Sequence, residues 1–77
     1  MTTMLAALST DKIYREILDV LDRWIWVRQA DVVLEIRESF VFDIEDFEEA
    51  VDQLEEDDLI TITKDNEGHV VLRQEDI

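Results

Sequence analysis

The sequence contains no cysteine, no proline and only one glycine among its 77 residues. Without cysteine there can be no disulfide, no zinc–thiolate site and no thiol nucleophile. A single glycine cannot supply the glycine-rich loop that holds phosphates in nucleotide-binding proteins. A chain of this length forms one domain, and it buries only about 60% of its unfolded surface, so a roomy catalytic cleft is not expected.

Basic side chains are scarce as well. Lys and Arg number 7 against 21 Asp and Glu, which gives a formal net charge of −14. Such a charge repels nucleic acid and anionic membranes. However, 47% of the residues are hydrophobic, which is ordinary for a folded domain and too high for an acidic disordered tail. We therefore expect a folded protein that contacts other proteins and binds neither nucleic acid nor membrane directly.

The apolar residues 4–8 are the one segment that could belong to a targeting signal. They lack a basic segment before them and are too few for a signal peptide or a membrane span. The expected compartment is the cytoplasm.

Most of the excess charge lies in one segment of the chain. Residues 43–59 carry ten acidic side chains and no basic one, whereas residues 1–42 and residues 60–77 each have a net charge of −2. The remainder of the chain is therefore nearly ordinary in charge. The acidity is a property of one region.

Apolar residues at helical spacing predict a first helix over residues 11–24, with Thr10 as its N-cap. Residues 24–27 are aromatic and β-branched, and they either finish this helix or form a short strand. We interpret residues 29–39 as a second helix, although Val32 and Val33 also favour a strand. Ala30, Val33, Leu34 and Arg37 fit one face of such a helix.

The clearest helix is predicted to begin after an N-cap at Asp43. Its apolar stripe consists of Ile44, Phe47, Ala50, Val51 and Leu54. After Leu59 the period changes to two, and residues 64–68 have turn chemistry in which Asn66 and Gly68 can take positive φ. This pattern predicts a β-hairpin of about twelve residues.

The predicted fold class is α+β, with three helices followed by a C-terminal β-hairpin. This order, together with the stretch FEEAVDQLEEDDLITI, resembles a winged helix-turn-helix domain. The resemblance covers roughly residues 10–73 and implies a single winged-helix-like domain over 1–77, with an N-terminal segment 1–9 and a frayed tail 74–77. The connector at residues 39–42 departs from the family, which usually has a small or turn-forming residue there.

The chemistry of the third helix departs further from that family. In DNA-binding winged helices this helix enters the major groove and presents basic and amide side chains. The matching exposed positions in this sequence are all acidic, namely Glu45, Asp46, Glu48, Glu49, Asp52, Glu55 and Glu56. Contact between this face and phosphates is unfavourable. The resemblance therefore implies a DNA-binding surface of inverted sign.

An ordinary solvated helix face is the simplest explanation for an acidic run, but it normally mixes signs. Here like charges stand four apart at 45/49, 48/52 and 52/56, and each such pair costs about 0.2–0.5 kcal/mol. Carboxylates at residues 55–58 also oppose the helix dipole. Local stability would favour lysine at these places.

We interpret the seven acidic residues as a partner-binding surface that mimics the phosphate row of a nucleic acid. Such a surface suits a basic groove on a nucleic-acid-binding protein. In size, acidity and lack of catalytic groups the chain resembles small phage-encoded inhibitors of host defence, of the anti-CRISPR or anti-restriction type, which act in the host cytoplasm. Two alternatives stay open: a winged-helix subunit of a larger complex, and a winged-helix DNA-binding regulator of a halophile.

No catalytic residue, cofactor or metal site is predicted. His69 is the only histidine, and no nucleophile or orienting group accompanies it. Glu55 to Asp58 lack the spacing and glycine of an EF-hand. The aromatic residues Trp24, Trp26, Phe40 and Phe42 are expected in the core, with exposure of the last three as anchors for a partner or a homodimer as the alternative.

Overall fold

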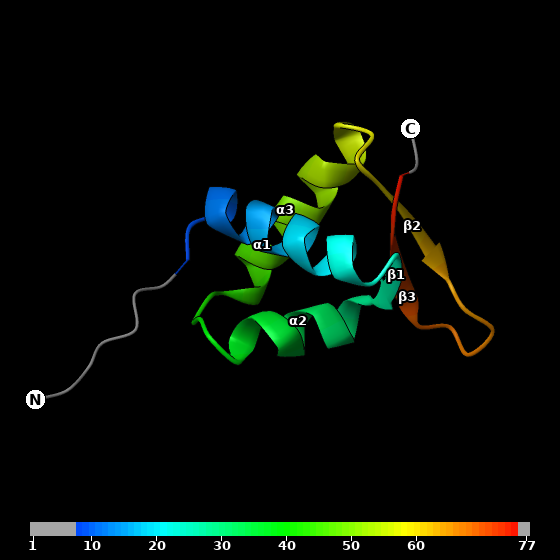
Figure 1. The fold of residues 1–77 in the computed structure, drawn as a ribbon, viewed down its shortest axis with the longest axis horizontal. Helices are drawn as coiled ribbons and strands as arrows, with labels where there is room; N and C mark the ends of the chain where they lie inside the picture. The colour runs from blue at the N-terminus through cyan, green and yellow to red at the C-terminus, as the bar shows by residue number, and fades with distance from the viewer. Residues whose placement is uncertain (1–7, 76–77) are drawn as a thin grey trace, which may run out of the picture.

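The computed structural model describes residues 8–75, which form three helices and a three-stranded antiparallel sheet (Figure 1). The order along the chain is α1 (Thr10–Arg23), β1 (Trp26–Arg28), α2 (Gln29–Arg37), α3 (Ile44–Glu56), β2 (Ile60–Lys64) and β3 (Val70–Gln74). Strand β3 is central, and the sheet order is β1-β3-β2. The predicted α+β class, with three helices before a C-terminal hairpin, is confirmed, and a short strand adds a third strand to the sheet.

The short strand β1 joins the helices to the hairpin. Helix α1 ends at Arg23, and β1 begins at Trp26, so residues 24–27 do not continue the helix. Val27 lies opposite Leu72, and Ile62 lies opposite Leu72 from the other side. The Gln74 N–H donates to the Ile25 carbonyl at 3.0 Å, which extends this pairing by one bond.

The core lies between the helices and one face of the sheet. Helix α1 packs against both α2 and α3, and the sheet lies at one end of the helices (Figure 1). Phe47 is fully buried and stacks on Phe42, with ring centroids 5.8 Å apart. The predicted stripe of α3 is confirmed at Phe47, Ala50, Val51 and Leu54, whereas Ile44 is 43% exposed because it lies in the first turn, at the rim of the core.

The start and the end of α1 differ from the prediction. The N-cap is Ser9, whose Oγ accepts from the Lys12 N–H at 3.4 Å, so the prediction of Thr10 is wrong by one residue. Trp24 was expected in the core but is 59% exposed. Its backbone leaves the helical conformation at φ −131° and ψ 85°, so the helical spacing of α1 no longer determines where its side chain lies.

The remaining aromatic residues divide between core and surface. Phe42 is buried as expected, and Phe40 is half-buried against the core. Trp26 is 61% exposed, so its assignment to the core is wrong. It lies opposite Arg73 in the β1–β3 pairing, on the sheet face away from Val27 and the helices.

Helix α2 is confirmed, but its buried face is rotated relative to the prediction. Val32, Val33 and Ile36 are buried, whereas Leu34 is 62% exposed. Arg37 is exposed, and its guanidinium carbon lies 5.1 Å from the centroid of the Phe42 ring, so the molecule contains a cation–π contact. Packing of α2 against α1 selects the β-branched residues as its inner face.

Helix α3 ends in a Schellman-type motif without glycine. Asp58 has φ 59°, the Leu59 N–H donates to the Leu54 carbonyl at 3.0 Å, and the Asp58 N–H donates to the Glu55 carbonyl at 3.0 Å. At the other end Asp43 occupies the N-cap position, but its side chain makes no capping hydrogen bond. The helix is therefore terminated by backbone geometry at one end and left without a side-chain cap at the other.

The turn between β2 and β3 is organised by Asp65. Its Oδ1 accepts from the Glu67 and His69 N–H groups, each at 2.9 Å. Gly68 takes φ 85° as predicted, whereas Asn66 does not have positive φ. The two hydrogen bonds to one carboxylate and the left-handed glycine close the hairpin.

The described ends of the chain are held by backbone hydrogen bonds. The Leu8 N–H donates to the Val41 carbonyl at 2.8 Å, and the Glu75 N–H donates to the Leu59 carbonyl at 3.0 Å. Gln74 is the last residue of β3, so it does not belong to a frayed tail. Residues 1–7 of the predicted N-terminal segment, and residues 76–77, lie outside the described part. None of the helices within residues 8–75 is long and apolar enough to cross a membrane.

Candidate protein-interaction site

The outer face of α3 places most of the predicted site residues together. At 3.6 residues per turn, six of the seven carboxylates lie within about 120° around the helix axis. We call these six the acidic face: Glu45, Glu48, Glu49, Asp52, Glu55 and Glu56. All six are exposed. Asp46 lies beside the buried stripe and is half-buried, so it does not belong to this surface.

No basic side chain neutralises the acidic face. The ion pairs within residues 8–75 join Arg23 to Asp19 and Glu35, Arg28 to Asp65 and Glu67, and His69 to Glu67. None of them includes a residue of α3. The last turn of α3 has no basic residue, so its carboxylates meet the negative end of the helix dipole without compensation.

Asp57, which follows the last residue of the acidic face, accepts two side-chain hydrogen bonds. The Tyr14 hydroxyl donates to Asp57 Oδ2 at 2.6 Å, and Gln53 Nε2 donates to Asp57 Oδ1 at 3.1 Å. The hydrogen bond to Asp57, with burial and the negative charge of Asp57 adding to it, raises the pKa of Tyr14. Asp57 thus ties α1 to the end of α3, which fixes the acidic face relative to the rest of the molecule.

An apolar groove adjoins the acidic face at the start of α3. It has a volume of about 510 Å³, and Leu34, Ile44 and Glu48 are among its lining residues, with Val33 and Val70 below them. Leu34 and Ile44 are exposed although both were predicted to face the core. This groove forms between α2, α3 and β3, which are separated in sequence, so no local pattern could have revealed it.

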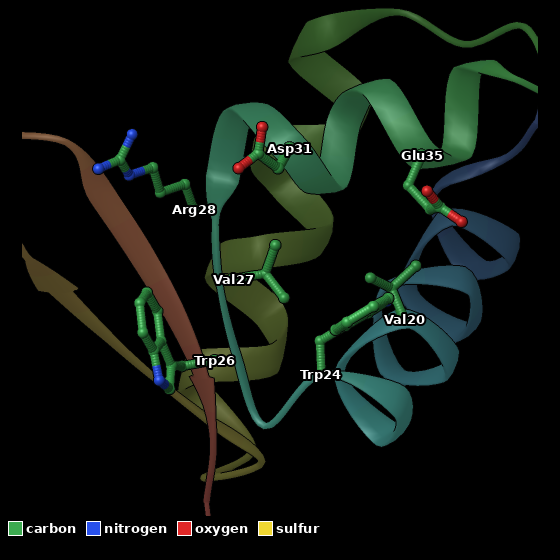
Figure 2. A pocket seen from close by; sticks show the side chains of 7 residues that line it. All are labelled: Val20, Trp24, Trp26, Val27, Arg28, Asp31 and Glu35. Atoms are coloured by element: carbon green, nitrogen blue, oxygen red, sulfur yellow. The ribbon is translucent and has the colours of Figure 1, made fainter.

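A second groove lies between the end of α1, β1 and α2 (Figure 2). It has a volume of about 370 Å³ and is lined by both tryptophans, by two apolar residues and by three charged ones, namely Trp24, Trp26, Val20, Val27, Arg28, Asp31 and Glu35. We call it the tryptophan groove. The signal that could have indicated it is the short sequence Trp24-Ile25-Trp26, whose large side chains leave the core when the helix ends.

His69 is exposed, and its Nε2 lies 3.4 Å from Glu67 Oε2 in the β2–β3 turn, with no nucleophile beside it. Within residues 8–75 no three His, Asp or Glu side chains gather as metal ligands.

Comparison with known proteins adds no relative. No protein-family model, curated protein or solved structure matches the chain.

Proposed function

We propose that this protein is a non-catalytic interaction module whose acidic face binds a basic, nucleic-acid-binding surface of a partner protein in the cytoplasm. The observation that carries this proposal is the acidic face itself: six exposed carboxylates on one side of α3, with no ion pair to any described residue. Like charges at this spacing weaken the helix in isolation. A cationic partner would relieve that repulsion.

The charge density of α3 is close to that of a nucleic acid. Residues 45–56 span about 17 Å of helix axis, so the six carboxylates place a charge roughly every 3 Å. A single strand of DNA carries one phosphate per about 3.4 Å, and the duplex carries one per about 1.7 Å. A groove that accommodates one phosphate strand therefore meets a similar row of charges on α3.

The surroundings of α3 support a protein partner over DNA. In the resemblance to winged-helix proteins α3 corresponds to the DNA-contacting helix, but six carboxylates and no basic side chain lie on its exposed side. Charge of this sign speeds association with a basic protein surface. Inhibition of that partner by occupation of its nucleic-acid groove, as phage-encoded anti-CRISPR-type proteins do, is the role that we propose.

The test is affinity purification from the native host with three baits. The baits are the wild-type protein, the acidic-face variant Glu48→Lys, Glu49→Lys, Asp52→Lys, and a control variant Asp11→Lys, Glu16→Lys, Glu38→Lys with the same change in net charge outside α3. We expect the wild type and the control to retain the same nucleic-acid-binding protein, and the acidic-face variant to lose it. Added DNA or RNA should displace that protein.

Two results would contradict the proposal. Equal capture by the acidic-face variant and the wild type would show that α3 is not the contact. A gel shift of double-stranded DNA by the wild-type protein at moderate salt would show direct binding to nucleic acid in place of mimicry.

A further inference from the structure

The exposed apolar side chains of the α1–β1 corner do not take part in the core and are not adjacent to the acidic face. Trp24, Ile25 and Trp26 are 59%, 68% and 61% exposed. Three large apolar residues in a row on the surface of a 77-residue chain are costly, because a domain this small needs its large side chains inside. Exposed tryptophan is the residue type most enriched at the centres of binding sites.

The tryptophan groove combines an aromatic wall with an apolar floor. In Figure 2 the Trp24 indole lies toward Val20 on the α1 side, and Val27 projects into the groove from β1. Val20 is almost fully buried, so it forms the floor, whereas more than half of Trp24 is open to solvent. Trp26 and Arg28 complete the lining at β1, with their side chains on the other side of the strand from Val27. A volume of about 370 Å³ is at the low end for ligand sites and suits one long side chain.

The charges around this groove favour a cation. Asp31 and Glu35 stand one turn apart on α2 and point outward above the apolar floor. Among the described residues no basic group lies within 4.0 Å of the Asp31 carboxylate, whereas Glu35 lies 3.7 Å from Arg23. Arg28 is neutralised by Asp65 at 3.1 Å and by Glu67 at 3.7 Å. The groove therefore has one carboxylate without an ion pair to a described residue, Asp31, at the end opposite the Trp24 indole, with Val27 between them.

We propose that the tryptophan groove binds an arginine side chain of a polypeptide partner. The aliphatic stem lies on Val20 and Val27, the guanidinium stacks on the Trp24 indole, and its N–H groups donate to Asp31. Arginine suits this arrangement better than lysine because its planar, weakly hydrated head stacks on an aromatic face and offers several donors at once. The molecule already holds Arg37 over the Phe42 ring in the same manner, at 5.1 Å.

The charge of the chain argues against two other occupants. A second copy carries a net charge of −14, and its approach to Asp31 is repelled. A nucleic acid would meet the same repulsion from Asp31 and Glu35. The arginine site lies on the side of α1 and α2, apart from the acidic face, and it does not depend on the function proposed for α3.

The test uses the two tryptophans as separate reporters on the full chain. Each gives one indole N–H signal in a ¹H–¹⁵N spectrum, and Trp24→Phe and Trp26→Phe assign the two. The probe is the peptide acetyl-Gly-Arg-Gly-amide, and the control peptide replaces arginine by citrulline, which has nearly the same shape without the charge. We expect the arginine peptide to shift the Trp24 signal saturably in the millimolar range. The citrulline peptide should bind about two- to fivefold more weakly.

A matched pair of variants tests the carboxylate. Asp31→Asn should weaken binding of the arginine peptide about two- to fivefold, whereas Asp11→Asn makes the same change in net charge away from the groove and should leave it unchanged. Both sites are exposed, so neither variant threatens the fold. The acidic-face variant Glu48→Lys, Glu49→Lys, Asp52→Lys should also retain the shift of Trp24, even if α3 proves to have no partner.

Four outcomes would overturn the arginine site. They are equal binding of the citrulline and arginine peptides, equal weakening by Asp31→Asn and Asp11→Asn, loss of the shift in the acidic-face variant, and absence of any saturable shift up to the solubility limit of the peptide. The second and third would mean that the overall negative charge, and not the groove, attracts the peptide.

Discussion

Helix α3 and the turn between β2 and β3 are both acidic, yet their carboxylates have different surroundings. In the turn, Asp65 accepts two backbone hydrogen bonds and pairs with Arg28 at 3.1 Å, and Glu67 lies within ion-pair distance of Arg28 and His69. On α3 the six residues of the acidic face have no such partner among the described residues.

This difference indicates that the carboxylates of the turn stabilise the fold, whereas those of the acidic face are available to a partner. The carboxylates of the turn hold a hairpin closed, so their loss should be felt in stability. Those of α3 oppose each other and the helix dipole, so their loss should weaken binding of the partner and slightly raise stability. Three stability measurements test this difference, and they follow in decreasing order of expected effect.

The largest effect is expected on the buried side of α3. Phe47→Ala removes a fully buried ring that stacks on Phe42, and it should lower the free energy of unfolding by about 3–5 kcal/mol. The matched control Ile44→Ala lies on the same helix but is 43% exposed, and it should cost less than about 1.5 kcal/mol. Denaturant titration measures both. Similar losses in the two variants would mean that α3 is not anchored by its apolar stripe.

A smaller loss is expected in the turn. Asp65→Ala removes both hydrogen bonds and the ion pair and should lower Tm, whereas Asp65→Asn keeps an acceptor oxygen and should lie between Asp65→Ala and the wild type. The hydrogen bond from the His69 N–H is the largest cause of the lowered pKa of Asp65, whose usual value is 3.8. Burial opposes it, and the hydrogen bond from Glu67 and the charges of Arg28 and His69 also lower this pKa.

The pH dependence of this loss has a definite sign. Because the folded pKa of Asp65 is depressed, its contribution is fully present above the unfolded value of 3.8 and is lost as the pH falls through the lower folded value. The difference in Tm between the wild type and Asp65→Ala should therefore be constant near neutral pH and should close in strong acid. A difference that stays constant below pH 3 would contradict the role given to the charge.

The smallest effect is expected for the acidic face. In the variant Glu48→Lys, Glu49→Lys, Asp52→Lys, the like pairs at 45/49 and 52/56 become pairs of opposite sign, while 48/52 stays a like pair. The free energy of unfolding should rise by about 0.5–1 kcal/mol. The control variant Asp11→Lys, Glu16→Lys, Glu38→Lys makes the same change in net charge but turns the opposite pairs 11/15 and 12/16 of α1 into like pairs, so it should lower stability. A clear loss of stability in the acidic-face variant would mean that these carboxylates have structural roles.

Much of the fold could be predicted because helices and strands repeat their apolar residues at fixed periods. The stripe from Phe47 to Leu54 identified α3 and its inner face, and the change to a period of two after Leu59 identified the hairpin. The same stripe placed six of the seven site residues on the exposed side. Asp46 was misplaced because it lies beside the stripe, where a few degrees of rotation decide exposure.

Details that depend on packing could not be predicted in the same way. Ala30 and Leu34 fit a helical stripe as well as Val32 and Ile36 do, and only contact with α1 decides that the latter are buried. The position of Trp24 continues the helical spacing of α1, but the backbone leaves the helix there and the side chain turns out to solvent. The N-cap also differs by one residue, at Ser9 and not at Thr10, because the spacing of apolar residues does not specify the exact residue at which a helix begins.

The sequence by itself determined the types of element, their order and the concentration of charge in one helix, because these properties depend on neighbours within a few positions along the chain. The tertiary structure alone decided that no described basic side chain pairs with the acidic face and that Trp24, Val27 and Asp31 line one groove. Such a groove exists only where elements distant in sequence pack together. The periodicity of a sequence does not indicate which distant elements come into contact.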